Sequence, residues 1–91
     1  MASDERVRRL EALDRETVLH PATALHTHQV QGGLIAESGQ GVMLSDIQGN
    51  QYIDAMAGLW CVNVGYGRPE LARAAAEQME KLSYYHTFAG A

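Results

Sequence analysis

Few side chains in this 91-residue sequence could carry out chemistry, and the histidines are the first to consider. His26 and His28 are two residues apart, so on a strand both imidazoles would lie on one face, as two ligands of one metal ion do. No third or fourth ligand is evident beside them, and His20 and His86 are distant in the sequence. We therefore predict no metal site and interpret these histidines as solvated or bonded to the backbone.

The one cysteine, Cys61, could act as a thiol nucleophile with His86 as its base. No oxyanion-stabilising motif accompanies the two residues, and Cys61 lies within an apolar segment. A buried, unreactive thiol is the commonest state of a cysteine in such surroundings. We therefore expect no catalytic residue among these side chains.

Residues 54–67 hold the only tryptophan, Trp60, in an apolar segment with glycines at positions 58, 65 and 67. Residues 55–62 form a nearly unbroken apolar run, which has neither the alternation of a half-exposed strand nor the spacing of a helix. Glycine permits backbone shapes closed to other residues and lets other groups approach closely. The pattern alone favours a core tryptophan beneath a loop, and the wall of a binding site is the alternative.

This segment and its flanks resemble the N-terminal part of the class III pyridoxal-phosphate aminotransferases, especially the omega-amino-acid, amine and polyamine transaminases. The resemblance covers about residues 20–89, and its longest block is contiguous. The matching positions are His20-Pro21-x-Thr23, Gly41-Val42-x-Leu44, Asp46-x-x-Gly49-Asn50, Asp54, the block from Met56 to Arg68, and Tyr85-x-Thr87-Phe88. With this resemblance, a pocket wall becomes the favoured interpretation of Trp60.

The resemblance implies a parent of α/β architecture, a fold-type-I transferase that works as a homodimer with active sites at the subunit interface. Its cofactor would be pyridoxal phosphate, and it would move an amino group from an amine or omega-amino acid to a keto acid such as pyruvate. Members of the family are several times longer, so we expect the chain to be a fragment without activity of its own. The alternatives are a non-catalytic, self-associating fragment, a truncated relic, or a mutase, racemase or decarboxylase of the same fold.

By the same resemblance, Leu59 and Trp60 match positions that line the substrate pocket, and Phe88 matches one that reaches the neighbouring subunit's active site. Ala22 and Ala89 also border that pocket, at positions where close relatives often carry phenylalanine. Replacing an aromatic ring with a methyl group removes a large volume. The resemblance therefore implies a pocket of different width or shape.

The family's principal cofactor contacts are its aldimine lysine, a phosphate-binding turn and an aspartate beside the pyridine nitrogen, and all lie further along a family member than this chain extends. Lys81 is the only lysine present, and it lies near the end of a predicted amphipathic helix, where a solvated side chain is expected. We therefore expect no cofactor-binding residue in this chain.

Two helices and three strands should position these residues. A helix is predicted over residues 3–18, because Ser3 can cap it and apolar residues recur at spacing three. A second is predicted over 69–82, with Pro69 at its first position and Lys81 near its end. Strands are predicted over 34–37, 42–47 and 51–55, with hairpin-like separators and Asp46 bonded to the turn backbone.

The expected architecture is therefore α+β: an N-terminal helix, a three-stranded antiparallel meander and a second helix. We divide it into a helical arm over residues 1–20, a small-domain sheet with the site-lining loop over 21–67, and a segment over 68–91 that leads toward a large cofactor domain.

Composition bounds the partners of the chain. Its 46% hydrophobic residues are ordinary for a globular protein, and its net charge is −4 with one lysine and six arginines. The negative net charge and the small number of basic residues do not suit binding to nucleic acid or to an anionic membrane, which needs clustered basic residues. A single cysteine excludes an internal disulfide, and the charged first ten residues do not resemble a secretory signal. We expect a cytoplasmic protein.

Overall fold

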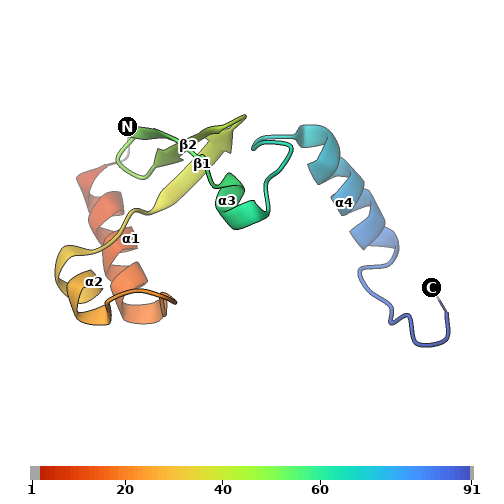
Figure 1. Cartoon of the computed structure of the whole chain (residues 1–91), viewed down its shortest axis with the longest axis horizontal. Helices are drawn as coiled ribbons and strands as arrows, with labels where there is room; N and C mark the ends of the chain where they lie inside the picture. Colours follow the sequence, from red (N-terminus) through yellow and green to blue (C-terminus); the bar gives the residue numbers. More distant parts are fainter. Residues whose placement is uncertain (1–2, 91) are drawn as a thin grey trace.

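A computed structural model of the protein describes residues 3–90, which form four helices and one three-stranded sheet (Figure 1). The elements in chain order are α1 (Asp4–Thr17), α2 (Leu25–Gln31), β1 (Ala36–Gln40), β2 (Met43–Asp46), β3 (Gln51–Ile53), α3 (Ala57–Trp60) and α4 (Pro69–Lys81). Figure 1 shows α1, α2 and the sheet gathered at one end, with α4 and the C-terminal segment extending away from them. This arrangement confirms the predicted α+β class.

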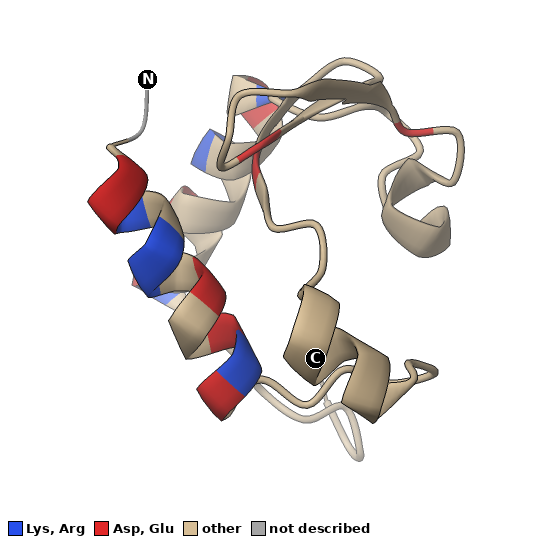
Figure 2. Ribbon diagram, turned by 90° about the vertical axis from the view of Figure 1, so that its left-hand side faces the viewer, with Lys and Arg blue, Asp and Glu red and all other residues tan. Residues whose placement is uncertain are grey.

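Helix α1 begins and ends where its sequence predicts. Ser3 has an extended backbone and its hydroxyl accepts a 3.3 Å hydrogen bond from the backbone N–H of Arg6, which is an N-cap. The helix ends at Thr17, before His20 and Pro21. Acidic and basic residues are mixed along α1, as Figure 2 shows. One of these residues, Arg6, forms an ion pair with Glu37 that joins α1 to β1.

Residues Leu25–Gln31 form helix α2 and not the strand on which the imidazoles of His26 and His28 would share a face. In an α-helix, residues two apart point to different sides, because each residue turns the chain by about 100°. His28 is accordingly buried, whereas His26 is exposed. The paired-histidine arrangement considered from the sequence is therefore wrong.

The sheet is the predicted antiparallel meander, with strand order β1-β2-β3. Strand β1 lies later in the sequence than predicted, because Gly39 and Gln40 pair with Leu44 and Met43 instead of forming the turn. Gly41, with φ of 58°, takes the first position of the two-residue loop, a conformation that glycine adopts without strain.

The loop between β2 and β3 is organised by Asp46, as predicted. Its carboxylate accepts hydrogen bonds of 2.9 Å from the backbone N–H groups of Gln48 and Asn50, from the Asn50 side chain and from the Tyr52 hydroxyl. These bonds, the Asn50 side chain first, lower the pKa of Asp46 from 3.8 to about 2. The turn is therefore fixed by an ionised, largely buried carboxylate.

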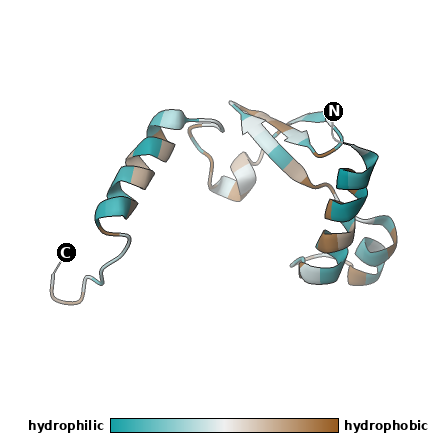
Figure 3. Cartoon of the chain, turned by 180° about the vertical axis from the view of Figure 1, so that it is seen from behind, coloured by the Kyte–Doolittle hydropathy of each residue, from teal (hydrophilic) through white to brown (hydrophobic). Residues whose placement is uncertain are grey.

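Helix α4 confirms the predicted second helix, with Pro69 at its start and Lys81 in its last turn. Its apolar stripe contacts no other element closely: Leu71, Met79 and Leu82 are each more than half exposed. Figure 3 shows the apolar and polar residues alternating along this isolated helix. The stripe is therefore left uncovered.

The described residues enclose almost no core. Ile47 is the one buried hydrophobic residue among them, and the buried polar residues are His28 and Asp46. The accessible surface is 7738 Å², against about 5,200 Å² expected for a compact monomer of this mass. The radius of gyration is 17.3 Å, against about 12 Å expected. Much apolar surface is therefore uncovered.

No helix in the described part of the chain is both long and apolar enough to cross a membrane.

Candidate functional site

The apolar segment 54–67 is held by the side chain of its first residue. One carboxylate oxygen of Asp54 accepts a hydrogen bond of 3.0 Å from the backbone N–H of Met56. The other accepts bonds of 2.7 Å from the N–H of Gly58 and 2.5 Å from the Tyr66 hydroxyl. The Tyr66 bond, followed by the Gly58 bond, lowers the pKa of Asp54, and the same contact raises the pKa of Tyr66. Asp54 therefore ties together both ends of the segment.

Tyr66 is itself fixed on the β1–β2 hairpin. Its backbone exchanges two hydrogen bonds with Gly41, of 2.8 and 3.0 Å. Its ring lies against Gly39, where an added Cβ would come within 2.6 Å of the Tyr66 Cγ atom. Gly39 is therefore needed for the close approach of the tyrosine ring, and through it for the position of the segment.

The segment turns at α3, whose backbone is strained. Leu59 and Trp60 have φ of 65° and 68°, and Ala57 has φ of 49°. Left-handed conformations are uncommon for residues with a Cβ and are outliers for bulky ones. Such residues are concentrated at functional sites, where the surrounding structure holds them. Here the bonds of Asp54 and Tyr66 provide that support.

The strained turn presents apolar side chains outward. Trp60 is 81% exposed and Leu59 is 58% exposed, so the core tryptophan that the local pattern alone favours is wrong. Cys61 is exposed as well, which corrects the expectation of a buried thiol. An aromatic ring on a supported turn has the rigidity and apolar area typical of a binding-site wall.

The other residues predicted to border the pocket lie elsewhere in the chain. Ala22 lies in the connection between α1 and α2, with φ of 50°. Phe88 and Ala89 follow α4, and Figure 1 shows this end of the chain far from α3. Phe88 is 93% exposed, and its ring lies 4.9 Å from that of His86. The chain therefore brings Leu59 and Trp60 together but not the remaining three.

The position of Lys81 bears on where pyridoxal phosphate could be held. The cofactor would require a lysine amine to hold its aldehyde group, and backbone N–H groups or basic side chains to hold its phosphate. Lys81 is the single lysine, and it lies exposed in the last turn of α4. That end of a helix carries partial negative charge, which disfavours a phosphate.

The structure brings together one group of polar residues that the sequence did not indicate. Asp14 on α1 lies between His20 and His28, although six and eight residues separate the three in turn. The sequence signal was weak, because the contact depends on α2 folding back against the end of α1. Pro21, which begins the reversal, was the only local sign of it.

Comparison with known proteins identifies the class of protein to which this fold belongs. A sequence profile described as aminotransferase class-III matches residues 24–90. The chain belongs to the class-III aminotransferase family.

Particular relatives cover most of the chain. It is 51% identical over 79 residues to an uncharacterised aminotransferase of Sinorhizobium fredii, covering 84% of this chain and 17% of that protein. It is 44% identical over 86 residues to a putrescine–pyruvate aminotransferase of Pseudomonas aeruginosa, covering 94% and 19%. The chain therefore spans less than a fifth of the length of these relatives.

Solved structures agree with this assignment. An (S)-enantioselective omega-transaminase from Thermomicrobium roseum superposes with a TM-score of 0.86 at 44% identity, covering 91% of this chain and 19% of that one. The structural neighbours are fold-type-I transaminases, which confirms the predicted fold class.

Proposed function

We propose that this chain forms one wall of the substrate pocket of an aminotransferase that moves an amino group from an amine or omega-amino acid to a keto acid such as pyruvate. The observation that carries the proposal is the turn at Leu59 and Trp60, which is strained, anchored by Asp54, and exposed although apolar. In this role the indole contacts the apolar part of the amino donor and limits its orientations. Membership of the family supports the reaction class.

Pyridoxal phosphate is the cofactor of the proposed enzyme, and when bound it carries the amino group between donor and acceptor. Because Lys81 is unsuited to hold it, we propose that the cofactor contacts belong to a part of the enzyme outside this chain. The same argument predicts that the 91-residue chain alone does not transfer amino groups. The residues of this chain bind and orient the amino donor, and they exclude water from it.

We propose further that the enzyme is a homodimer in which Phe88 enters the partner subunit's pocket. The extended position of residues 83–90 and the 93% exposure of Phe88 support this role. Ala22 and Ala89 then border the same pocket from two chains, and their small side chains widen it. Such a pocket favours donors with a bulkier body than those of relatives with phenylalanine at these positions.

The predicted division of the chain into residues 1–20, 21–67 and 68–91 is part of the proposal. The last part begins where the chain leaves the sheet for α4. The first part acts as a helical arm that also contacts the second through Arg6 and Glu37. With a single cysteine and no need for disulfides, we propose a cytoplasmic enzyme.

The alternative is a non-catalytic chain that associates with copies of itself. The observation that favours it is the uncovered apolar surface, which soluble monomers rarely tolerate. An assay of amino-group transfer distinguishes the two functions, because only the aminotransferase would carry it out.

The test is an assay of alanine formation from pyruvate with pyridoxal phosphate and a panel of donors: putrescine, an omega-amino acid and an aromatic amine. We expect the complete enzyme to use at least one donor and the isolated 91-residue chain to use none. A complete enzyme that forms no alanine with any amine would contradict the proposed reaction. Transfer by the isolated chain would contradict the assignment of the cofactor contacts to another part of the enzyme.

A further inference from the structure

A carboxylate and two imidazoles converge where α1 meets α2. The Asp14 Oδ1 atom lies 2.7 Å from Nε2 of His20, and Oδ2 lies 3.0 Å from Nε2 of His28. One ligand atom from each of the three residues lies within 4.8 Å of the others. Imidazole nitrogens and carboxylate oxygens are ligands of zinc, and sites with three protein ligands keep a position for water.

The His28 ring is buried without a full set of hydrogen bonds. Its side chain is only 6% exposed, and its Nε2 atom has no hydrogen-bond partner among the described residues. The atom is near Asp14 Oδ2, but the direction of the contact does not suit a hydrogen bond. A buried polar atom left in this way costs free energy, and an ion is one of the few groups that would satisfy it.

The imidazole rings of His20 and His28 are close enough to bind one ion together. The centroids of His20 and His28 lie 4.2 Å apart with an angle of 46° between the ring planes. In this arrangement both Nε2 atoms lie near the same carboxylate, one beside each of its oxygens. The arrangement is assembled from three separate parts of the chain, α1, the α1–α2 connection and α2.

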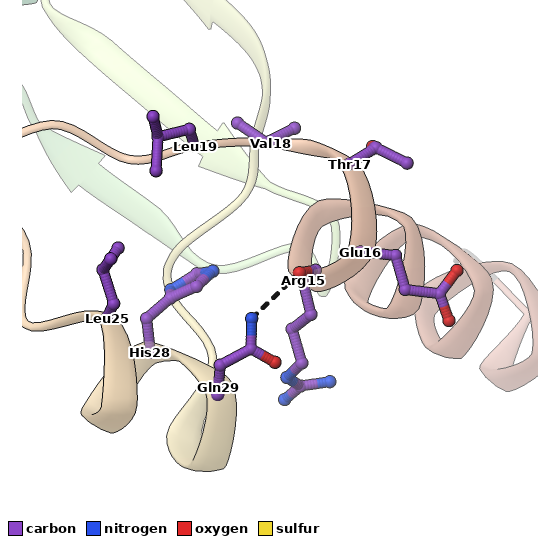
Figure 4. Close-up of a pocket in the computed structure, with 8 residues that line it drawn as sticks. All are labelled: Arg15, Glu16, Thr17, Val18, Leu19, Leu25, His28 and Gln29. Atoms are coloured by element: carbon purple, nitrogen blue, oxygen red, sulfur yellow. Dashed lines mark hydrogen bonds between the residues drawn. The ribbon is translucent and has the colours of Figure 1, made fainter.

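Helix α2 is tied to α1 beside this cluster. The Gln29 side-chain amide donates a 3.0 Å hydrogen bond to the backbone carbonyl of Arg15, drawn dashed in Figure 4. Gln29 follows His28 and Arg15 follows Asp14, so the bond holds the imidazole and the carboxylate opposite each other. In Figure 4, His28 lies beside Gln29 and Leu25 on α2.

Solvent can reach the cluster through hollows on the surface. One hollow of about 270 Å³ is lined by both His20 and His28, together with Thr23 and Gly33. A second, of about 280 Å³, has His28 and Leu25 in its lining. The first hollow provides an entry path for an ion and room for a water molecule on the imidazole side.

We propose that Asp14, His20 and His28 form a binding site for a divalent transition-metal ion of the zinc class. The two Nε2 atoms and one Asp14 oxygen are its ligands, and water from the hollow completes the coordination. Ligand atoms around tetrahedral zinc are about 3.3 Å apart, so the Asp14 carboxylate must withdraw slightly from the histidines to admit the ion. The bound ion fastens α1 to α2 and so stabilises the fold around the site.

The test uses protein without a histidine tag, freed of metal by a chelator, and titrated with Zn²⁺ by calorimetry and with Co²⁺ by visible absorption. We expect one ion for each chain and the intense absorption of tetrahedral cobalt without a thiolate band, because Cys61 is not a ligand. His28→Gln should weaken binding by at least about tenfold. Loss of a residue that only supports a metal ligand already weakens binding by about that factor, and loss of a ligand itself should cost no less.

His26→Gln is the matched control, because His26 lies exposed on the same helix. It should bind both ions as the unsubstituted protein does. If His28→Gln does not fold, Asp14→Asn replaces it as a near-isosteric variant, and Zn²⁺ should raise the melting temperature of the control but not of Asp14→Asn. The absence of stoichiometric binding, or equal weakening by His26→Gln, would overturn the proposal.

Discussion

The hydroxyl of Tyr66 donates a 2.5 Å hydrogen bond to the carboxylate of Asp54 across twelve residues of sequence. The bond closes the apolar segment into a loop, and the pairing of Tyr66 with Gly41 fixes the loop on the sheet. The strained turn at Leu59 and Trp60 lies inside it. The position of the indole therefore depends on Tyr66, which lies outside the turn itself.

Tyr66→Phe removes that hydrogen bond without changing the packing of the ring. We expect the variant to be less stable than the unsubstituted chain, since the lost hydrogen bond has a charged acceptor. The pKa of Asp54 should rise toward its ordinary value, because the Tyr66 hydroxyl is the main group that lowers it. Denaturant unfolding and a carboxyl titration by NMR measure the two effects. Tyr84→Phe is the control, because Tyr84 is 81% exposed. An unchanged Asp54 titration in Tyr66→Phe would show that the Tyr66 hydroxyl does not bond to this carboxylate.

Gly39→Ala tests the support from the other side. The new Cβ would lie within 2.6 Å of the Tyr66 ring, so the tyrosine must move away from the hairpin. Overpacking of this kind costs about 1–3 kcal/mol. Gly90→Ala is the control, since nothing lies within 4 Å of its added Cβ. Equal stability of the two variants would show that Tyr66 does not pack as described.

The stability of the chain should depend on pH through Asp46. The pKa of this carboxyl is lowered from 3.8 to about 2 in the folded chain, chiefly by the Asn50 side chain. A group with a lowered folded pKa stabilises above its unfolded pKa, and the stabilisation is lost as pH falls from 3.8 to about 2. Unfolding midpoints across this range should fall less in Asp46→Asn than in the unsubstituted chain. Glu80→Gln, at an exposed position on α4, should keep the full dependence.

The elements predicted correctly are those specified by neighbouring residues. Ser3 caps α1, Pro69 begins α4 and Asp46 organises its own turn, and each acts within a few residues of itself. Helix α2 was missed because its sequence, Leu-His-Thr-His-Gln-Val-Gln, has no regular apolar period. Its helical form depends on packing His28 against α1.

Features of the site that depend on distant contacts could not be predicted. The left-handed backbone of Leu59 and Trp60 contradicts the local preference of both residues, and only the surrounding bonds maintain it. The Asp54–Tyr66 bond and the Asp14 cluster join residues whose spacing has no motif. The resemblance supplied Leu59 and Trp60 as candidates, but not the means by which they are held.

The 91-residue chain should associate with itself when it is produced alone. The exposed large hydrophobic residues include Trp60, Phe88, Met79 and Ile53, each more than 60% exposed. Burying them against a second chain is favourable by about 25 cal/mol per Å² of apolar surface. Sedimentation velocity should show a mass above 9.9 kDa that rises with concentration. A single monomeric species at high concentration would be the contrary result.

We propose that Trp60 borders the amino donor, and the donor selectivity of Trp60→Ala in the complete enzyme tests this role. The ratio of kcat/KM for a bulky aromatic amine to that for a small omega-amino acid should change by about tenfold or more, the range for altered apolar pocket contacts. Leu71→Ala, at an exposed position on α4, should leave the ratio unchanged. If Trp60→Ala keeps the ratio of the unsubstituted enzyme, the indole does not line the pocket.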